Sequence, residues 1–313
     1  MVVTVGVDAV AERPLPETVF EQLRARLGDR SQASLRITQD GGVEARYWKV
    51  DLIGPGAAAW SDTQDAGGLF RASTREVCAE LQSAALPLLV PAPNCQLGVE
   101  GRDKWVPNPR ASGDDTMARL RFLGVLMGAA ARAGAFMELD LPALFWKLLV
   151  GEQLCRIDLG SADQRIVEFL EQLAAVADEA GWLALGPVCW RVRSASGRLV
   201  QVPRPVAAAL AALEPELEPE PERGLNPTQA CDDGGGANIV VWKDRDEYIV
   251  AAEALRLHEF DEQTSVIRSG LAEVCPASLL PLLTWRELEA RCCGAPSIEL
   301  NLLRSIAKYD GQY

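Results

Sequence analysis

The longest apolar stretch of the chain, residues 118–159, has the hydrophobic pattern of two helices joined by a short turn. In its first half, leucines accompany Gly124 and Gly128, and small residues four positions apart let another helix approach closely. Gly134 is placed to end this helix, and Pro142 stands where a first-turn proline is tolerated. Because the stretch is too short to span a bilayer and is bracketed by arginines, we predict a buried helical hairpin.

Periodic apolar positions predict further helices on both sides of this stretch, and alternating positions predict short strands. The predicted helices cover residues 14–28, a segment that follows a turn at Asp65, and residues 162–180, 247–260, 262–271, 279–283, 285–292 and 298–306. The predicted strands cover residues 35–37, 47–53, 182–185, 188–192 and 199–202, with a turn at Ser196 and Gly197. Residues 87–93 and 105–109 are interrupted by prolines and are predicted to be loops or edge pieces.

Residues 203–229 differ from the rest of the chain because proline and glutamate dominate them. Their centre reads Leu213-Glu-Pro-Glu-Leu-Glu-Pro-Glu-Pro-Glu. Glutamates repel one another and prolines favour an extended backbone, so a solvated linker is the favoured interpretation. An acidic docking peptide is the alternative.

The composition is that of a globular protein with a sizeable core, since 48% of the 313 residues are hydrophobic. The formal charge of −13 and the isoelectric point near 4.7 argue against nucleic acid and anionic membrane surfaces as partners, because both need clustered lysine and arginine. The N-terminus lacks a basic region followed by an apolar one, so no secretory signal is expected. We therefore expect a cytoplasmic protein, with the nucleus as the alternative.

The titratable residues offer little catalytic chemistry. Eight scattered cysteines include no C-x-x-C pair and are expected to be reduced thiols. Cys292 and Cys293 are interpreted as small buried residues, because adjacent cysteines bridge only with strain. The single histidine, His258, lies in a helical pattern and is expected at a surface or boundary position. No residues have the spacing of a zinc site, and we expect neither a metal nor a cofactor.

Two glycine-rich stretches have some features of phosphate-binding loops. Asp65-Ala-Gly-Gly lacks the lysine and the longer glycine spacing of such a loop, so it is interpreted as a tight helix entry. In residues 232–242 the glycines precede a strand instead of linking a strand to a helix, and two aspartates would repel phosphate. We therefore predict no nucleotide site at either place.

Several phrases follow one another in the order typical of a single family. They are Trp48-Lys-Val-Asp-Leu, Asp65-Ala-Gly-Gly-Leu-Phe-Arg, Arg121-Phe-Leu-Gly-Val-Leu-Met-Gly, Leu139-Asp-Leu-Pro, Phe145-Trp-Lys-Leu-Leu-Val-Gly-Glu, Gly270-Leu-Ala-Glu-Val-Cys-Pro, Leu283-Thr-Trp-Arg-Glu-Leu-Glu and Cys293-Gly. Together they resemble the N-terminal lobe of HECT-type ubiquitin ligases. The structural residues of these motifs would be Asp65, Gly67, Gly68, Arg71 and Trp146. Ala72 departs from the family, in which many members carry glutamate at this position.

The resemblance implies an α+β, mainly α-helical fold with a large helical subdomain and an inserted small α/β subdomain. Residues 1–160 would begin the large subdomain, residues 161–246 would form the small one with its acidic Pro-rich loop 203–229, and residues 247–313 would close the large one. In the family, the small subdomain docks a ubiquitin-conjugating enzyme in an apolar groove. The candidate docking residues are Phe169, Leu173, Trp182, Trp190 and Trp242. The alternative is that they only hold the small subdomain together.

HECT ligases carry ubiquitin as a thioester on a cysteine of a C-terminal lobe, because a thiolate is both a good nucleophile and a good leaving group. That lobe follows a hinge, and Tyr309, Gly311 and Tyr313 are the expected hinge residues. No phrase of the C-terminal lobe occurs in the sequence, so no cysteine is assigned a catalytic role. The expected partners are a ubiquitin-conjugating enzyme, ubiquitin and a protein substrate. A catalytically inactive adaptor and a helical scaffold are the alternative functions.

Overall fold

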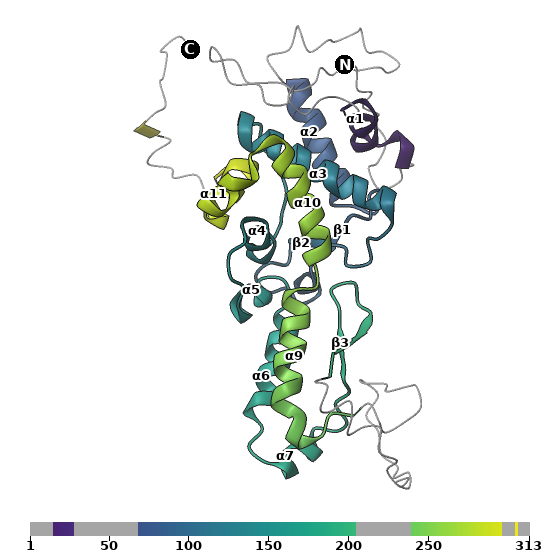
Figure 1. Ribbon diagram of the computed structural model, residues 1–313, viewed down its shortest axis with the longest axis vertical. Helices are drawn as coiled ribbons and strands as arrows, with labels where there is room; N and C mark the ends of the chain where they lie inside the picture. Colours follow the sequence, from purple (N-terminus) through teal and green to yellow (C-terminus); the bar gives the residue numbers. More distant parts are fainter. Residues whose placement is uncertain (1–14, 28–67, 205–238, 296–303, 306–313) are drawn as a thin grey trace.

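The computed structural model describes residues 15–27, 68–204, 239–295 and 304–305 (Figure 1). Helices make up most of this part, together with short antiparallel ribbons, so the predicted mainly helical α+β fold is confirmed. None of the described helices is long and apolar enough to cross a bilayer. The strands predicted at 35–37 and 47–53, residues 205–238 and most of the helix predicted at 298–306 lie outside the described residues.

The elements follow one another in a simple order along the chain. The first are the 3-10 helix η2 (Leu15–Glu17), α1 (Val19–Leu27), α2 (Gly68–Leu81), β1 (Leu89–Pro91), the 3-10 helix η4 (Pro93–Gln96), β2 (Trp105–Pro107), α3 (Asp114–Ala133), α4 (Ala143–Val150) and α5 (Arg156–Gly160). Then come α6 (Gln164–Ala175), α7 (Glu179–Ala184), β3 (Arg191–Arg193), β4 (Leu199–Gln201), the 3-10 helix η6 (Trp242–Asp244), α9 (Arg245–Leu257), α10 (Asp261–Val274), the 3-10 helix η7 (Ala277–Leu282) and α11 (Trp285–Cys293).

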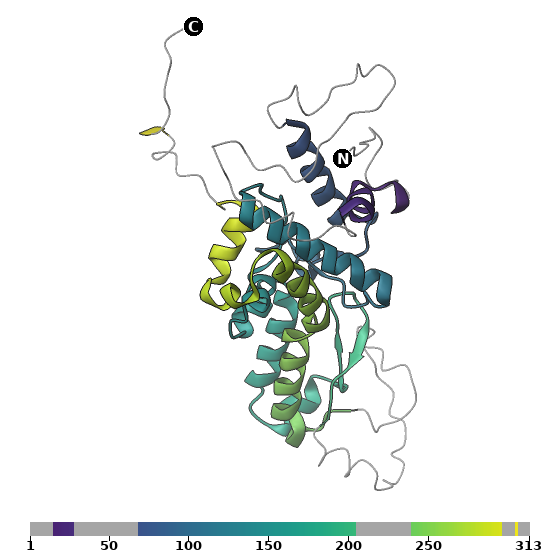
Figure 2. The ribbon, with the colours of Figure 1, turned by 45° about the horizontal axis from the view of Figure 1, so that its top comes forward.

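The upper half of the fold is organised around the packing of α3 against α10 (Figures 1 and 2). A Cβ added to Gly124 would overlap the carbonyl oxygen of Ile267, and one added to Gly270 would overlap the carbonyl oxygen of Arg121. The two backbones are therefore in contact, and the predicted close approach is confirmed. The partner is α10, however, while α4 packs against α10 and α11. The prediction of a hairpin between the two consecutive helices is therefore wrong.

The first hydrophobic core surrounds this helix pair. Apolar side chains from α1, α2, α3, α4, α10 and α11 contribute to it. A buried carboxylate joins two of these helices, because Glu80 of α2 accepts hydrogen bonds from the backbone N–H groups of Val19 (2.7 Å) and Phe20 (2.9 Å). The first N–H groups of a helix have no acceptor within the helix. The carboxylate of Glu80 accepts from two of these N–H groups at the start of α1 and so caps the helix.

The second hydrophobic core lies at the other end of the molecule, around α6, α7, α9 and the β3–β4 hairpin (Figure 1). Its largest fully buried side chains are Trp190 and Tyr248, which meet edge to face with 5.6 Å between ring centroids. α9 packs against α6, so this core extends past residue 246, the expected end of the small subdomain.

The segment after α6 differs from the prediction. The helix predicted over residues 162–180 ends at Ala175, and residues 182–185, predicted as a strand, belong to α7 or follow it directly. The side chain of Asp178 accepts a hydrogen bond from the N–H of Gly181 (2.8 Å) and so begins a new helix. The strand prediction is wrong. The apolar residues 182–185 are compatible with a strand or a helix, and the hydrogen bond from the N-cap Asp178 stabilises the helix.

The two ribbons agree better with the sequence. The strands predicted at 188–192 and 199–202 are present in shortened form as β3 and β4, and Gly197 forms the turn between them with φ of 81°. The proline-rich segments pair as β1 and β2, with Val90 opposite Val106. The edge-piece alternative for these two segments is therefore confirmed.

Candidate functional site

The predicted docking residues come together, but mostly inside the second core. The side chains of Leu173, Trp182 and Trp190 are buried, with exposed fractions of 2%, 4% and 1%. Phe169 and Trp242 are only partly buried. A fully buried ring supports its neighbours instead of reaching a partner, so the structure favours a packing role for the first three side chains.

The two remaining aromatic residues lie at edges of this core. The Trp242 ring lies 6.1 Å from that of Trp182 and is covered on one face by the guanidinium group of Arg245, 4.3 Å from its centroid. Trp182 also donates a hydrogen bond from Nε1 to the carbonyl oxygen of Val240 (3.2 Å). These contacts fix α7 against residues 240–242.

Exposed apolar side chains flank the contact between Trp182 and Val240. Leu183 and Leu185 at the end of α7 are 74% and 50% exposed, and Ile239 and Val241 are 42% and 45% exposed. We call these four residues the α7 rim. Large exposed apolar side chains that gather in one place, rather than singly, are typical of protein–protein contact surfaces. The α7 rim is therefore the better candidate for a docking surface.

The residues of the α7 rim are not among those predicted from the sequence to form a site. The sequence predicts that residues 182–185 are a strand. In the structure, residues 179–184 form α7, in which Trp182 is buried and Leu183 is exposed. The available signal was Asp178, an N-cap residue placed directly before Glu179-Ala-Gly. Which apolar residues remain exposed could only be known once the packing was known.

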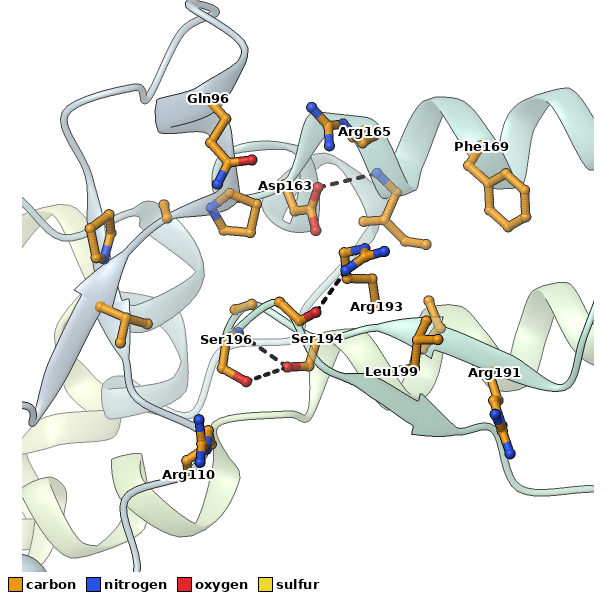
Figure 3. Close-up of a pocket in the computed structure, with 18 of the residues that line it drawn as sticks. Gln96, Arg110, Asp163, Arg165, Phe169, Arg191, Arg193, Ser194, Ser196 and Leu199 are labelled. Carbon is orange, nitrogen blue, oxygen red and sulfur yellow. Dashed lines mark hydrogen bonds between the residues drawn. The ribbon is translucent and has the colours of Figure 1, made fainter. Parts of the chain in front are cut away.

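A cleft of about 890 Å³ forms the second candidate site (Figure 3). Its walls are the segment around β1 and η4, the first turns of α6 and the β3–β4 hairpin. Phe169 and Arg165 on α6 face Leu199 and Arg193 on the hairpin across the open space. Its volume is in the upper part of the range typical of ligand clefts, about 300–1,000 Å³.

A buried ionic network fixes the α6 wall and the hairpin of this cleft. Asp163, the N-cap of α6, accepts a hydrogen bond from the N–H of Ile166 (3.2 Å) and pairs with Arg256 of α9 (2.9 Å). Arg256 also pairs with Glu259. The Glu259 carboxylate accepts a hydrogen bond from the N–H of Ala195 at the hairpin tip (3.1 Å). The hairpin and α6 are therefore both joined to the end of α9.

The third wall is fixed by a buried amide. Asn94 donates from Nδ2 to the carbonyl oxygens of Glu100 (3.1 Å) and Gly160 (2.9 Å). Its Oδ1 accepts a hydrogen bond from the N–H of Gln164 (2.7 Å) at the start of α6. A buried polar side chain with all of these bonds holds η4 rigidly against the junction of α5 and α6.

The thiols of the first core are poor nucleophiles. Burial raises the pKa of Cys78 and of Cys293 to about 12, and it also raises the pKa of Cys275 and, further, that of Cys292. Because the thiolate is the reactive form, these residues are suited to packing.

The remaining cysteines differ from one another. Cys95 and Cys155 are exposed and free. Cys189 is disulfide-bonded, so the expectation of reduced thiols is wrong at this position. Sequence spacing does not reveal which thiols the fold brings together.

The single histidine and the acidic side chains form no metal-binding cluster within the described part of the chain. His258 is exposed at the end of α9, as predicted, with Nδ1 3.0 Å from an oxygen of Asp261. Among the described residues, no group of three or more histidine, cysteine, aspartate or glutamate side chains could hold a metal ion.

Some of the residues expected to be structural lie within the described part of the chain. Trp146 is fully buried in the first core and meets Phe145 edge to face at 5.5 Å. Gly68 is the first residue of α2, and Arg71 is exposed on the same helix. Five further predicted residues lie outside the described part of the chain: Asp65, Gly67, Tyr309, Gly311 and Tyr313.

Comparison with known proteins identifies the family. The family model described as "HECT-domain (ubiquitin-transferase)" matches residues 75–313. The E3 ubiquitin-protein ligase HERC2 of Mus musculus is 31% identical over 299 residues, covering 94% of this chain and 5% of that protein. The Homo sapiens HERC2 matches equally, and the probable E3 ubiquitin-protein ligase HECTD4 of Homo sapiens is 32% identical over 254 residues, covering 77% of this chain and 6% of that protein.

This chain thus spans about one-twentieth of the length of the curated relatives that it matches. The family match covers α3 and α10, the helix pair around which the first core is built, and every element of the second core. The chain belongs to the HECT-domain (ubiquitin-transferase) family.

Proposed function

We propose that this chain acts as the N-terminal lobe of a HECT-type ubiquitin ligase and docks a ubiquitin-conjugating enzyme through its small subdomain. The conjugating enzyme would carry ubiquitin as a thioester. A cysteine thiolate of the family's C-terminal lobe would attack the thioester carbonyl, and the thiolate of the conjugating enzyme would leave. Ubiquitin would then pass to a lysine of a protein substrate.

The observation that carries this proposal is the α7 rim. Leu183, Leu185, Ile239 and Val241 form an exposed apolar edge on the subdomain that docks the conjugating enzyme in this family. The rings of Trp182 and Trp242 pack against each other beside this edge, and it is followed by charged residues, Lys243 and the ion pair of Arg245 with Asp246. An apolar centre with a charged border is the usual anatomy of a protein interface.

The proposed domain organisation follows the same resemblance. Residues 1–160 and 247–313 would form the large subdomain and residues 161–246 the small one. The shared second core, which includes α9, would make the junction between them rigid. We further propose that the protein acts in the cytoplasm or nucleus, where ubiquitin transfer takes place. The phrases Val106-Pro-Asn-Pro and Leu282-Leu-Thr-Trp-Arg-Glu-Leu-Glu indicate kinship with HECT domain-containing protein 3, which stays a prediction.

The test is a titration of the chain with a panel of ubiquitin-conjugating enzymes by isothermal calorimetry. We expect saturable binding to one or a few of them. Leu183→Ser should weaken it about tenfold or more, because an exposed apolar anchor at an interface contributes more than 1 kcal/mol. Leu282→Ser is the matched control, since Leu282 is 77% exposed on η7, away from α7.

Two outcomes would contradict the proposal. One is the absence of binding across the panel, which would favour a helical scaffold. The other is equal weakening by Leu183→Ser and Leu282→Ser, which would remove the α7 rim as the docking surface. Trp182→Ala is a poor probe, because it removes a core side chain and changes stability as well as binding.

A further inference from the structure

The cleft between α6 and the β3–β4 hairpin has a charge opposite to that of the chain as a whole. The chain has a formal charge of −13. The cleft is lined by Arg110, Arg165, Arg191 and Arg193, and its one acidic lining residue is Asp163. The carboxylate of Asp163 is already bound by Arg256 and by the N–H of Ile166. The excess positive charge is therefore not neutralised from within the cleft.

The four arginines also lack the partners that other arginines nearby have. Arg156, Arg245 and Arg256 each pair with a carboxylate. Within the part of the chain that the structure describes, none of the four cleft arginines forms such a pair. Arg193 donates one hydrogen bond to the carbonyl oxygen of Gly197 (2.8 Å), which orients its guanidinium group and leaves most of its N–H groups available.

The floor and walls of the same cleft carry apolar side chains. Val90, Ile166, Phe169 and Leu199 line it, and Leu199 is 53% exposed. Figure 3 shows Phe169 and Leu199 on opposite sides, with Arg165 and Arg193 beside them. A ligand that contains only phosphate would leave this apolar surface exposed to water. A peptide with alternating carboxylate and apolar side chains would use both surfaces, because guanidinium groups bind carboxylates in bidentate geometry.

We propose that this cleft binds an extended, glutamate- or aspartate-rich peptide segment of a partner protein. The α7 rim takes no part in it, so the proposal goes beyond docking of a conjugating enzyme. The hairpin is attached to Glu259, and Asn94 attaches η4 to the junction of α5 and α6, so the cleft is formed before the ligand arrives. A preformed site spends less free energy on ordering its own side chains.

The experiment is fluorescence anisotropy with the full chain and a labelled decapeptide that carries five glutamates separated by proline and leucine. The same peptide with five glutamines is the control probe. We expect saturable binding of the glutamate peptide alone, weakening as salt is raised. Arg165→Glu and Arg193→Glu should each weaken binding about five- to tenfold, since each turns an attraction into a repulsion.

Arg26→Glu is the matched control variant. Arg26 is exposed on α1, is not among the residues that line the cleft, and also has no carboxylate partner among the described residues. It should leave binding of the peptide unchanged. Circular dichroism would confirm that all three variants are folded, as expected for exposed residues.

Four outcomes would overturn the proposal. One is the failure of the glutamate peptide to bind the unmodified chain, and another is a loss of binding in Arg26→Glu as large as that in the cleft variants. An oligouridylate that competes with the peptide at equal concentration would point to a general anion site. Binding that emerges only after Glu214, Glu216, Glu218, Glu220 and Glu222 are changed to glutamine would show that the chain's own acidic stretch is the occupant.

Discussion

The two hydrophobic cores of this molecule are packed in different ways. In the first, α3 and α10 meet backbone to backbone at Gly124 and Gly270, and leucine, valine and phenylalanine side chains fill the space around them. In the second, the large rings of Trp182, Trp190 and Tyr248 fill the space between α6, α7, α9 and the β3–β4 hairpin.

The polar groups differ in the same way. In the first core, the buried Glu80 accepts from the backbone at one helix end. In the second, the network from Asp163 through Arg256 to Glu259 joins α6, α9 and the hairpin. The second core therefore depends on a few large side chains and buried ions, and apolar residues at its edges remain exposed. The α7 rim and the cleft are both such edges, which explains why both candidate sites lie in this half.

The largest expected effect is the loss of a ring from the second core. Trp190→Ala removes a side chain that is 1% exposed and should lower the free energy of unfolding by about 3–5 kcal/mol. Trp242→Ala removes a partly buried ring and should cost about 1 kcal/mol. Urea denaturation followed by far-ultraviolet circular dichroism measures both. Equal losses would contradict the greater contribution expected from the fully buried ring of Trp190.

Breaking the ionic network should have the next largest effect. Asp163→Asn retains an N-cap for α6 but removes the charge that pairs with the buried Arg256, and we expect a loss of about 3 kcal/mol in urea denaturation. Asp178→Asn is the matched control, because Asp178 is an exposed N-cap of α7 with no ion pair among the described residues. It should change stability by less than about 0.5 kcal/mol. A small effect at Asp163 would mean that the network is dispensable.

Separating the helices of the first core should have a somewhat smaller effect. Gly270→Ala places a methyl group on the carbonyl oxygen of Arg121 and should destabilise the fold by about 2–3 kcal/mol. At Gly128 the nearest atoms to an added Cβ lie at 3.0 Å, so Gly128→Ala requires only a small shift. The higher helix propensity of alanine should offset most of that cost. Thermal unfolding that ranks Gly128→Ala as the worse variant would contradict the close approach at Gly270.

The smallest expected effect depends on pH and concerns the junction of α4 and α5. Burial alone would raise the pKa of Asp158, but the Lys147 ammonium group (2.8 Å) and the N–H of Cys155 lower it below its ordinary value. A lowered pKa means that the ionised form stabilises the fold. This contribution is present above the pKa of the unfolded chain, about 3.9, and is lost as pH falls through the folded-state value.

Asp158→Asn should therefore cost about 1 kcal/mol at pH 7 and less at pH 3, as measured by urea denaturation at both values. Asp140→Asn is the control, since Asp140 is 61% exposed and 3.8 Å from Lys104. It should have no measurable effect at either pH. A cost for Asp158→Asn that does not change between the two values would assign the effect to shape instead of charge.

Local signals in the sequence were enough to locate most helices. Gly134 ends α3 in the left-handed conformation with φ of 68°, as its position predicted. Thr284 and Glu287 form a capping box that begins α11, close to the predicted start. These features depend on neighbours within one helical turn, and the sequence displays those neighbours directly. The same reasoning failed at Trp182, where the apolar run had the same pattern in a strand and in a short helix.

The sequence by itself determined the mainly helical fold, the small-residue face of α3 and the family. Only the tertiary structure decided that α10 covers this face, that Trp190 is buried and that Leu183 is exposed. Only the fold gathers Arg110, Arg165 and Arg193 around one cleft, because they come from a loop, a helix and a hairpin. The physical reason is that helix periodicity and capping arise from contacts within one turn of the chain. Which surfaces are covered depends on segments far apart in the sequence that meet only in the folded molecule.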